Sequence, residues 1–172
     1  VSVYFIGDQC AHVIADYIEA DDGLDERMKE ELGEHEYFRL KIRKNPVLRT
    51  QVPASLLEKS QAAVFPICQV YCRQTQNKLS DKFSDVSGTA EIVIQCTMTG
   101  DSIDSVMSTV SVAAKCLTDV IAEKRGTLMP GAYMNGAWAV TTEAVQAGGR
   151  KFVQSCKLVV GVDIKKPERS CK

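Results

Sequence analysis

An amphipathic stretch at residues 102–125 constrains the fold of this chain more than any other feature. Its apolar side chains recur every three or four residues and form one stripe along a helix: Ile103, Val106, Met107, Val110, Ala113, Ala114, Leu117, Val120 and Ile121. Asp101 or Ser102 suits the N-cap, Lys124 and Arg125 suit the last turn, and Gly126 suits the C′ position. Such a helix must bury its apolar side against another element.

Stretches with strand character lie on both sides of this helix. Residues 64–72 are an apolar run, and in residues 89–99 the apolar side chains Ile92, Ile94, Cys96 and Met98 alternate with those of the opposite face. We expect these two stretches to pair antiparallel. Residues 137–145 and 151–164 are two further strands, and the glycines of the QAGGR segment between them favour a tight hairpin.

These patterns predict an α+β fold. It has a mostly antiparallel four- to five-stranded sheet, one long amphipathic helix packed on a face, and a shorter N-terminal helix over residues 8–20. A length of 172 residues favours a single domain, 1–172. Within it we expect a charged excursion at about residues 21–62 and a polar C-terminal tail at residues 165–172.

The charges of the excursion are segregated. Residues 19–36 hold nine acids against Arg27 and Lys29, which indicates a solvated helix or a mobile segment. The sign then reverses, and Arg39, Lys41 and Arg43 alternate with apolar residues. This period of two predicts a strand with one apolar and one basic face. The segregation fits a homo-oligomer in which the acidic segment 19–36 of one subunit meets the basic segment 39–49 of another.

The seven cysteines are the one unusual count in the composition. Most lie in apolar segments, where free thiols behave as small buried hydrophobes. A zinc site using Cys68 and Cys72 is the alternative, but this spacing on a strand spans roughly 13 Å, which is too far for one tetrahedral ion.

Motifs of catalysis, metal binding and cofactor binding are not found in the sequence. His12 and His35 have no neighbouring nucleophile motif, and no phosphate-binding glycine motif is present. No apolar run approaches the roughly 18–20 residues that span a bilayer. We therefore expect no enzyme activity, no metal, no cofactor and no membrane partner.

Two regions are candidates for a protein interface. Trp138 is either an interface anchor or a half-buried aromatic residue of a strand. Residues 73–88 form a long polar loop that carries Leu79 and Phe83. These two side chains either dock on a neighbouring protein or fold back onto their own domain.

One block of the sequence resembles tail-terminator (tail-completion) proteins of long-tailed bacteriophages. It runs from FPICQVYC through TAEIVIQCTMTGDSIDSVMSTVSVAAKCLTDVI to TTEAVQAGGRKFVQSCKLVVGVDI and covers roughly residues 64–164. The likeness lies in the order of a Pro-containing apolar strand, a strand ending in a short turn, a helix along the sheet, and a last strand of alternating Val and Leu.

This resemblance implies a homo-oligomeric ring, six subunits in size, at the head-proximal end of the tail in the virion. The ring is assembled in the host cytoplasm, ends polymerisation of the tail tube protein and joins the tail to the head connector protein. In contractile tails it also meets the sheath protein. DNA passes through its lumen without specific binding.

Three other functions remain open from the residues. One is a cytosolic nucleic-acid-binding module that uses the basic strand 39–49. A net charge of -1 and an aromatic content of 6% argue against it. The others are another phage neck or tail assembly protein, and a small enzyme with a site at a subunit boundary.

Replacing Leu79 and Phe83 together by Ser tests the loop. If both side chains dock on a neighbour, the double variant keeps its circular dichroism spectrum and melting point while ring formation or tube capping weakens. Each buried large apolar side chain contributes about 1.5–3 kcal/mol. A melting point many degrees lower would place the pair in the core of the monomer instead.

Overall fold

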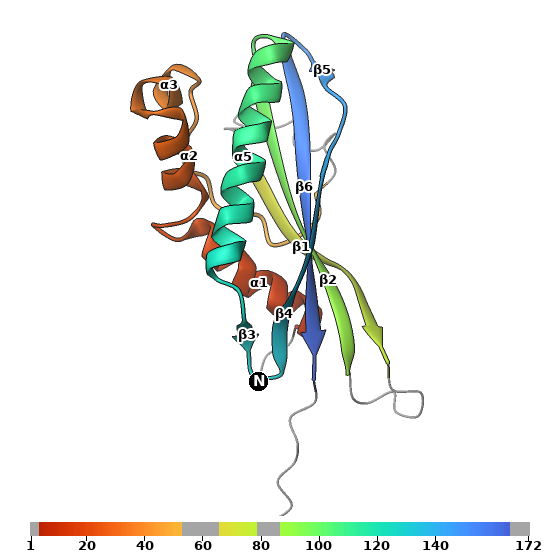
Figure 1. Ribbon diagram of the computed structural model, residues 1–172. Coiled ribbons are helices and arrows are strands. Elements are labelled where there is room, and N and C mark those ends of the chain that lie inside the picture. The colour runs from red at the N-terminus through yellow and green to blue at the C-terminus, as the bar shows by residue number, and fades with distance from the viewer. Residues whose placement is uncertain (1–3, 53–65, 79–86, 166–172) are drawn as a thin grey trace, which may run out of the picture.

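One antiparallel sheet with helices on one side makes up the described part of the chain (Figure 1). The computed structural model describes residues 4–52, 66–78 and 87–165. Its elements, in order, are α1 (Ile6–Glu19), α2 (Leu24–Leu32), α3 (Glu34–Arg39), β1 (Ile67–Asn77), β2 (Gly88–Gly100), α5 (Ile103–Glu123), β3 (Thr127–Met129), β4 (Ala132–Thr142), β5 (Gln146–Gly148) and β6 (Lys151–Ile164). The α+β fold is confirmed, with the long helix on the sheet and a short helix at the N-terminal end.

The sheet has six strands in the order β1-β2-β6-β4-β3, with β5 also paired to β6. Its centre is the pair β2–β6, which runs without a register shift from Gly88 opposite Ile164 to Gly100 opposite Phe152. The predicted antiparallel pairing of the first two strands and the predicted C-terminal hairpin are both confirmed. The short strands β3 and β5 were not predicted.

The core lies between the sheet and the underside of α5. The predicted faces of β2 and β6 are buried there, together with most of the predicted helix stripe: Ile92, Ile94, Cys96, Met98, Cys156, Leu158, Val160, Val162, Val106, Val110, Ala113, Leu117, Val120 and Ile121. Three residues of the stripe are exceptions: Ala114 is half-buried, and Ile103 and Met107 are 49% and 50% exposed. Ile103 and Met107 therefore contribute little to the core.

The caps of α5 explain where this helix begins and ends. The Ser102 hydroxyl oxygen accepts a hydrogen bond from the Ser105 N–H at 3.1 Å, as expected of an N-cap. Lys124 is the C-cap, and Gly126 follows with a φ of +114°. Gly126 was predicted at C′, but with Lys124 as the C-cap it occupies C″, the next position, where it turns the chain toward β3.

Three thiols lie side by side in the core. Cys68, Cys96 and Cys156 occupy one row across β1, β2 and β6. Hydrogen bonding with the Cys156 and Cys68 thiols, together with burial, raises the pKa of Cys96. Burial raises the pKa of Cys10 and Cys116 to about 11. These five cysteines are free and buried, as the sequence predicts.

The predicted basic strand around residues 38–43 is wrong. The chain is helical up to Arg39, and Lys41 then turns it with a φ of +56°. Tyr37 decides the local fold, because its ring is buried and its hydroxyl donates a hydrogen bond to the Asp25 carboxylate of α2. Burial of Tyr37 requires the helix, and a three-residue alternation is too short to compete with it.

The boundaries of two strands also differ from the prediction. β1 continues to Asn77, past a register shift between Cys72 and Gln74, so residues 73–77 of the predicted loop are strand. β4 begins at Ala132, before the glycine at position 136 that the sequence places in a loop. Leu79, Phe83 and most of the predicted tail 165–172 lie outside the described residues.

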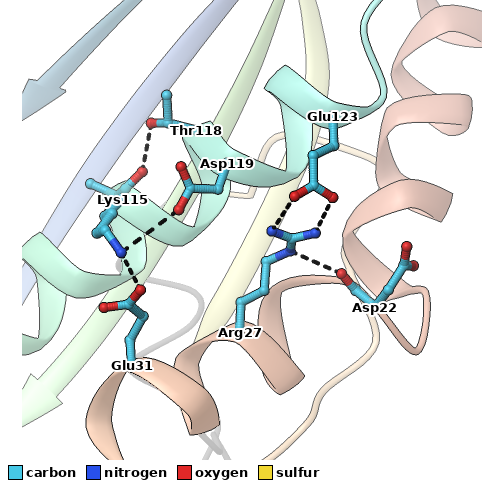
Figure 2. A network of polar contacts seen from close by, with 8 residues as sticks. Asp22, Arg27, Glu31, Lys115, Thr118, Asp119 and Glu123 are labelled. Carbon is cyan, nitrogen blue, oxygen red and sulfur yellow. Dashed lines mark hydrogen bonds and ion pairs between the residues drawn. The ribbon is translucent and has the colours of Figure 1, made fainter.

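Ion pairs fasten α2 to the outer side of α5 (Figure 2). The Arg27 guanidinium donates hydrogen bonds to both oxygens of the Glu123 carboxylate, with 3.0 Å between Nη1 and Oε1. Lys115 of α5 pairs with Glu31, which lies one helical turn after Arg27 in α2. These contacts hold the acidic stretch against the helix that covers the sheet.

The basic residues that follow are matched in the same way. The Arg49 guanidinium pairs with Asp16 and with Glu19, the latter at 2.8 Å, and Lys44 lies 3.6 Å from Asp21. Acidic and basic segments therefore meet within one chain. The expected match between segments of two subunits stays a prediction, for which the exposed side chains of Glu34, Lys41 and Arg43 remain.

The Arg27–Glu123 pair predicts a pH dependence of stability. Hydrogen bonding from Arg27 lowers the pKa of Glu123 from its usual 4.5. A lowered folded-state pKa stabilises the fold above the unfolded value, and this is lost as pH falls through the folded value. Glu123→Gln should melt below the wild type at pH 7, and the difference should shrink below pH 4.5.

Glu34→Gln is the matched control, since Glu34 is exposed and has no ion pair among the described residues. Its melting point should follow that of the wild type at every pH. A wild-type-to-Glu123→Gln difference that stays constant from pH 7 to pH 3 would contradict the role given to the pair.

Candidate interaction surface

β4 is an uncovered strand next to the edge of the sheet. One side of it pairs with β6, while β3 covers only its first residues, through Thr127 opposite Tyr133 and Met129 opposite Ala132. From Asn135 to Ala139 every residue is exposed. An unpaired apolar strand edge attracts other chains, and folded proteins usually shield one.

The hydrogen-bond pattern shows which groups of β4 face outward. The Glu143 N–H donates to the Ser155 carbonyl at 2.9 Å, so position 143 faces β6. Antiparallel ladders alternate, and Thr141 and Ala139 therefore also point toward β6. The main-chain groups of Trp138, Val140 and Thr142 point away, and no described segment pairs with them.

A bulge ends this free edge on the side of β3. Between Met134 and Trp138 three residues of β4 lie opposite the single residue Gly161 of β6. The Asn135 side chain occupies the space above Gly161, where a Cβ would lie 2.6 Å from its Oδ1 atom. That oxygen accepts the Ala137 N–H at 2.9 Å, and Gly136 has a φ of +83°.

A groove lies between β4 and the adjacent flank of α5. It has a volume of about 150 Å³ and is lined from both elements and from β6: Thr118, Ile121, Ala122, Arg125, Met134, Gly136, Ala137, Trp138, Leu158 and Val160. Trp138 forms part of its wall and is 58% exposed. Among ionisable side chains only Arg125 lines the groove, and it has no ion pair with a described residue.

The two flanks of α5 thus differ. One flank packs on α2 through ion pairs, while the other carries half-buried or exposed small residues such as Ala114, Thr118 and Ala122 beside the groove. The sheet surface under the second flank, at Trp138 and Val140, is left partly exposed. The layer of helices therefore stops short of the sheet edge.

Of the sequence-predicted site residues, only Trp138 lies at this surface. Arg39 is at the end of α3 and pairs with Glu36, with 2.7 Å between Nε and Oε2. Lys41 and Arg43 are exposed in the following turn and coil. The predicted basic strand is absent, so the nucleic-acid hypothesis loses the feature on which it was based.

A second cavity, beside Arg43, is too small for a ligand. Its volume is about 20 Å³, and Glu19, Asp25 and Lys44 are among its lining residues. That volume accommodates about one water molecule. Leu79 and Phe83 lie outside the described residues, so their docking stays a prediction.

Within residues 4–52, 66–78 and 87–165, the side chains that could bind a metal ion do not converge on one point. No three His, Cys, Asp or Glu side chains there are grouped so that they could hold a metal ion. The His12 ring donates a hydrogen bond from Nδ1 to the Asp8 carbonyl oxygen, 2.7 Å away, and lies tilted against the Tyr4 ring with 4.7 Å between the ring centroids. In this part of the chain α5 alone is long and apolar enough to cross a membrane, and its apolar side packs on the sheet.

Two adjacent threonines of β4 test the direction of its hydrogen bonds. Thr142→Pro should leave stability nearly unchanged, because the lost N–H faces outward on the edge. Thr141→Pro removes an N–H that pairs with β6 and should cost about 1–3 kcal/mol. Urea unfolding measures both variants. Equal stability losses would show that the alternation is assigned incorrectly.

Comparison with known proteins gives this surface no assigned role. No protein-family model matches the chain, and no curated protein matches it. The observations that bear on its function are the open strand edge, the Trp138 groove and the resemblance of residues 64–164 to tail-terminator proteins.

Proposed function

We propose that this protein is a phage virion structural protein, a tail terminator that assembles into a ring at the head-proximal end of the tail tube. The observation that supports this most directly is the uncovered edge of β4 beside the Trp138 groove. A domain with an unpaired apolar edge gains stability when another chain covers it. An assembly protein uses such a surface, whereas the described residues offer no convergent catalytic groups.

The open edge also fits assembly into a closed ring. β4 lies at one side of the sheet and β1 at the other, so the two edges present different residues. A contact between two different patches of the same chain is head-to-tail, and it closes into a ring when the rotation between subunits divides a full turn. Six subunits is the number that the resemblance implies.

Such a ring has two ends with separate tasks. One end stops addition of tail tube protein, and the other joins the head connector protein, with the sheath as a further neighbour in contractile tails. The net charge of -1 fits a lumen through which DNA passes without being held. Localisation in the virion neck follows from this role.

Electron microscopy and tube capping test the proposal. Negative-stain images of the purified full chain should show uniform rings, either alone or after mixing with tail tubes of the same virus. Added to polymerising tube protein, the chain should stop growth and leave one capped end on each tube. A chain that remains monomeric and also fails to bind tubes would rule out the tail-terminator function.

A further inference from the structure

The side chains that line the groove beside β4 suit a contact with another protein surface. Its floor is apolar, its wall is the exposed Trp138, and Arg125 is its one ionisable side chain. The occupant that fits must bring an apolar or aromatic group and a carboxylate. A guanidinium beside an aromatic ring also favours an aromatic residue of the partner.

The same chain carries a patch with this complementary chemistry. At the start of α1, Phe5 is 55% exposed and has an extended backbone, with φ −63° and ψ 152°. Asp8 follows in the first turn of the helix, is exposed and forms no ion pair with a described residue. Neither residue lines the groove of its own chain.

The start of α1 lies beside β1, whereas Trp138 is on β4, and both are at the same level along the strands. Gly7 lies directly against Cys72 of β1, since a Cβ there would be 2.5 Å from the Cys72 Sγ. Cys72 is in the same row of paired residues as Ile92, Val160 and Trp138. Copies related by rotation, without a shift along the strands, therefore bring patches at one level together.

We propose that the Trp138 groove of one copy receives the Phe5–Asp8 start of α1 from a second copy of this chain. The Phe5 ring packs against Trp138, and the Asp8 carboxylate pairs with Arg125. This contact rests on the proposed ring, to which it gives a specific subunit interface. Because the two patches differ, each copy offers one groove and one helix start, and the contact repeats head to tail.

A charge-reversal cycle tests the contact in the full-length chain. Sedimentation velocity over a concentration series measures self-association of the wild type, Asp8→Lys, Arg125→Glu and the double variant. Each single reversal places like charges together and should weaken self-association about tenfold or more, while the double variant restores attraction. Restoration to within about threefold of the wild type is the expected result.

Matched controls separate this contact from general effects of charge. Asp104→Lys makes the same change in the first turn of another helix, and Arg150→Glu makes it on an exposed arginine outside the groove. Both controls should associate as the wild type does. Circular dichroism and melting curves establish that every variant is folded.

Three results would overturn the contact. One is a wild type that is monomeric at every concentration, another is single reversals that associate normally, and the third is a folded double variant that fails to recover. If Arg125→Glu still forms rings, the interface is wrong but the tail-terminator function remains supported. If the double variant recovers self-association but the chain never caps tubes, the interface is supported and the tail-terminator function is wrong.

Discussion

The pairing of β2 with β6 is the constraint on which the other elements depend. Every residue of β2 has a partner in β6, and α5 packs across both strands. A slip of one residue would turn Ile92, Ile94 and the facing Leu158 toward the opposite side of the sheet. Since β1 attaches to β2 and β4 attaches to β6, the fixed register also sets the level of both outer strands.

The helix layer is anchored on one side only, and this asymmetry creates the open surface. Arg27 and Lys115 tie α2 and α5 together on one flank, and their partners are exposed carboxylates. On the other flank the sheet extends farther than the helices, so Trp138 stands beside a groove. The flank of α5 that carries the ion pairs is thus covered by α2, whereas the apolar surface on the opposite flank, beside Trp138, is exposed.

The sequence predicts the elements whose patterns are long. The stripe of α5 and the alternation of β2 and β6 extend over enough residues that packing and local pattern agree. The prediction of a basic strand was wrong because burial of the Tyr37 ring in a helix outweighs the short alternation of apolar and basic residues at 38–43. Trp138 was identified as an interface candidate by type alone, whereas Arg125 was assigned only to a helix end. A groove between segments distant in sequence leaves no local signal, so the position of Arg125 needed the structure.

The bulge at Asn135–Ala137 has a consequence for how a neighbouring chain can be positioned. There the Asn135 side chain already uses the Ala137 N–H, and the strand departs from regular pairing. A chain lying along β4 can therefore bond to Trp138, Val140 and Thr142 but cannot slide on toward β3. If the proposed ring forms through β4, this bulge acts as an end stop. It then fixes the offset and the angle at which successive subunits meet, and with them the diameter of the ring.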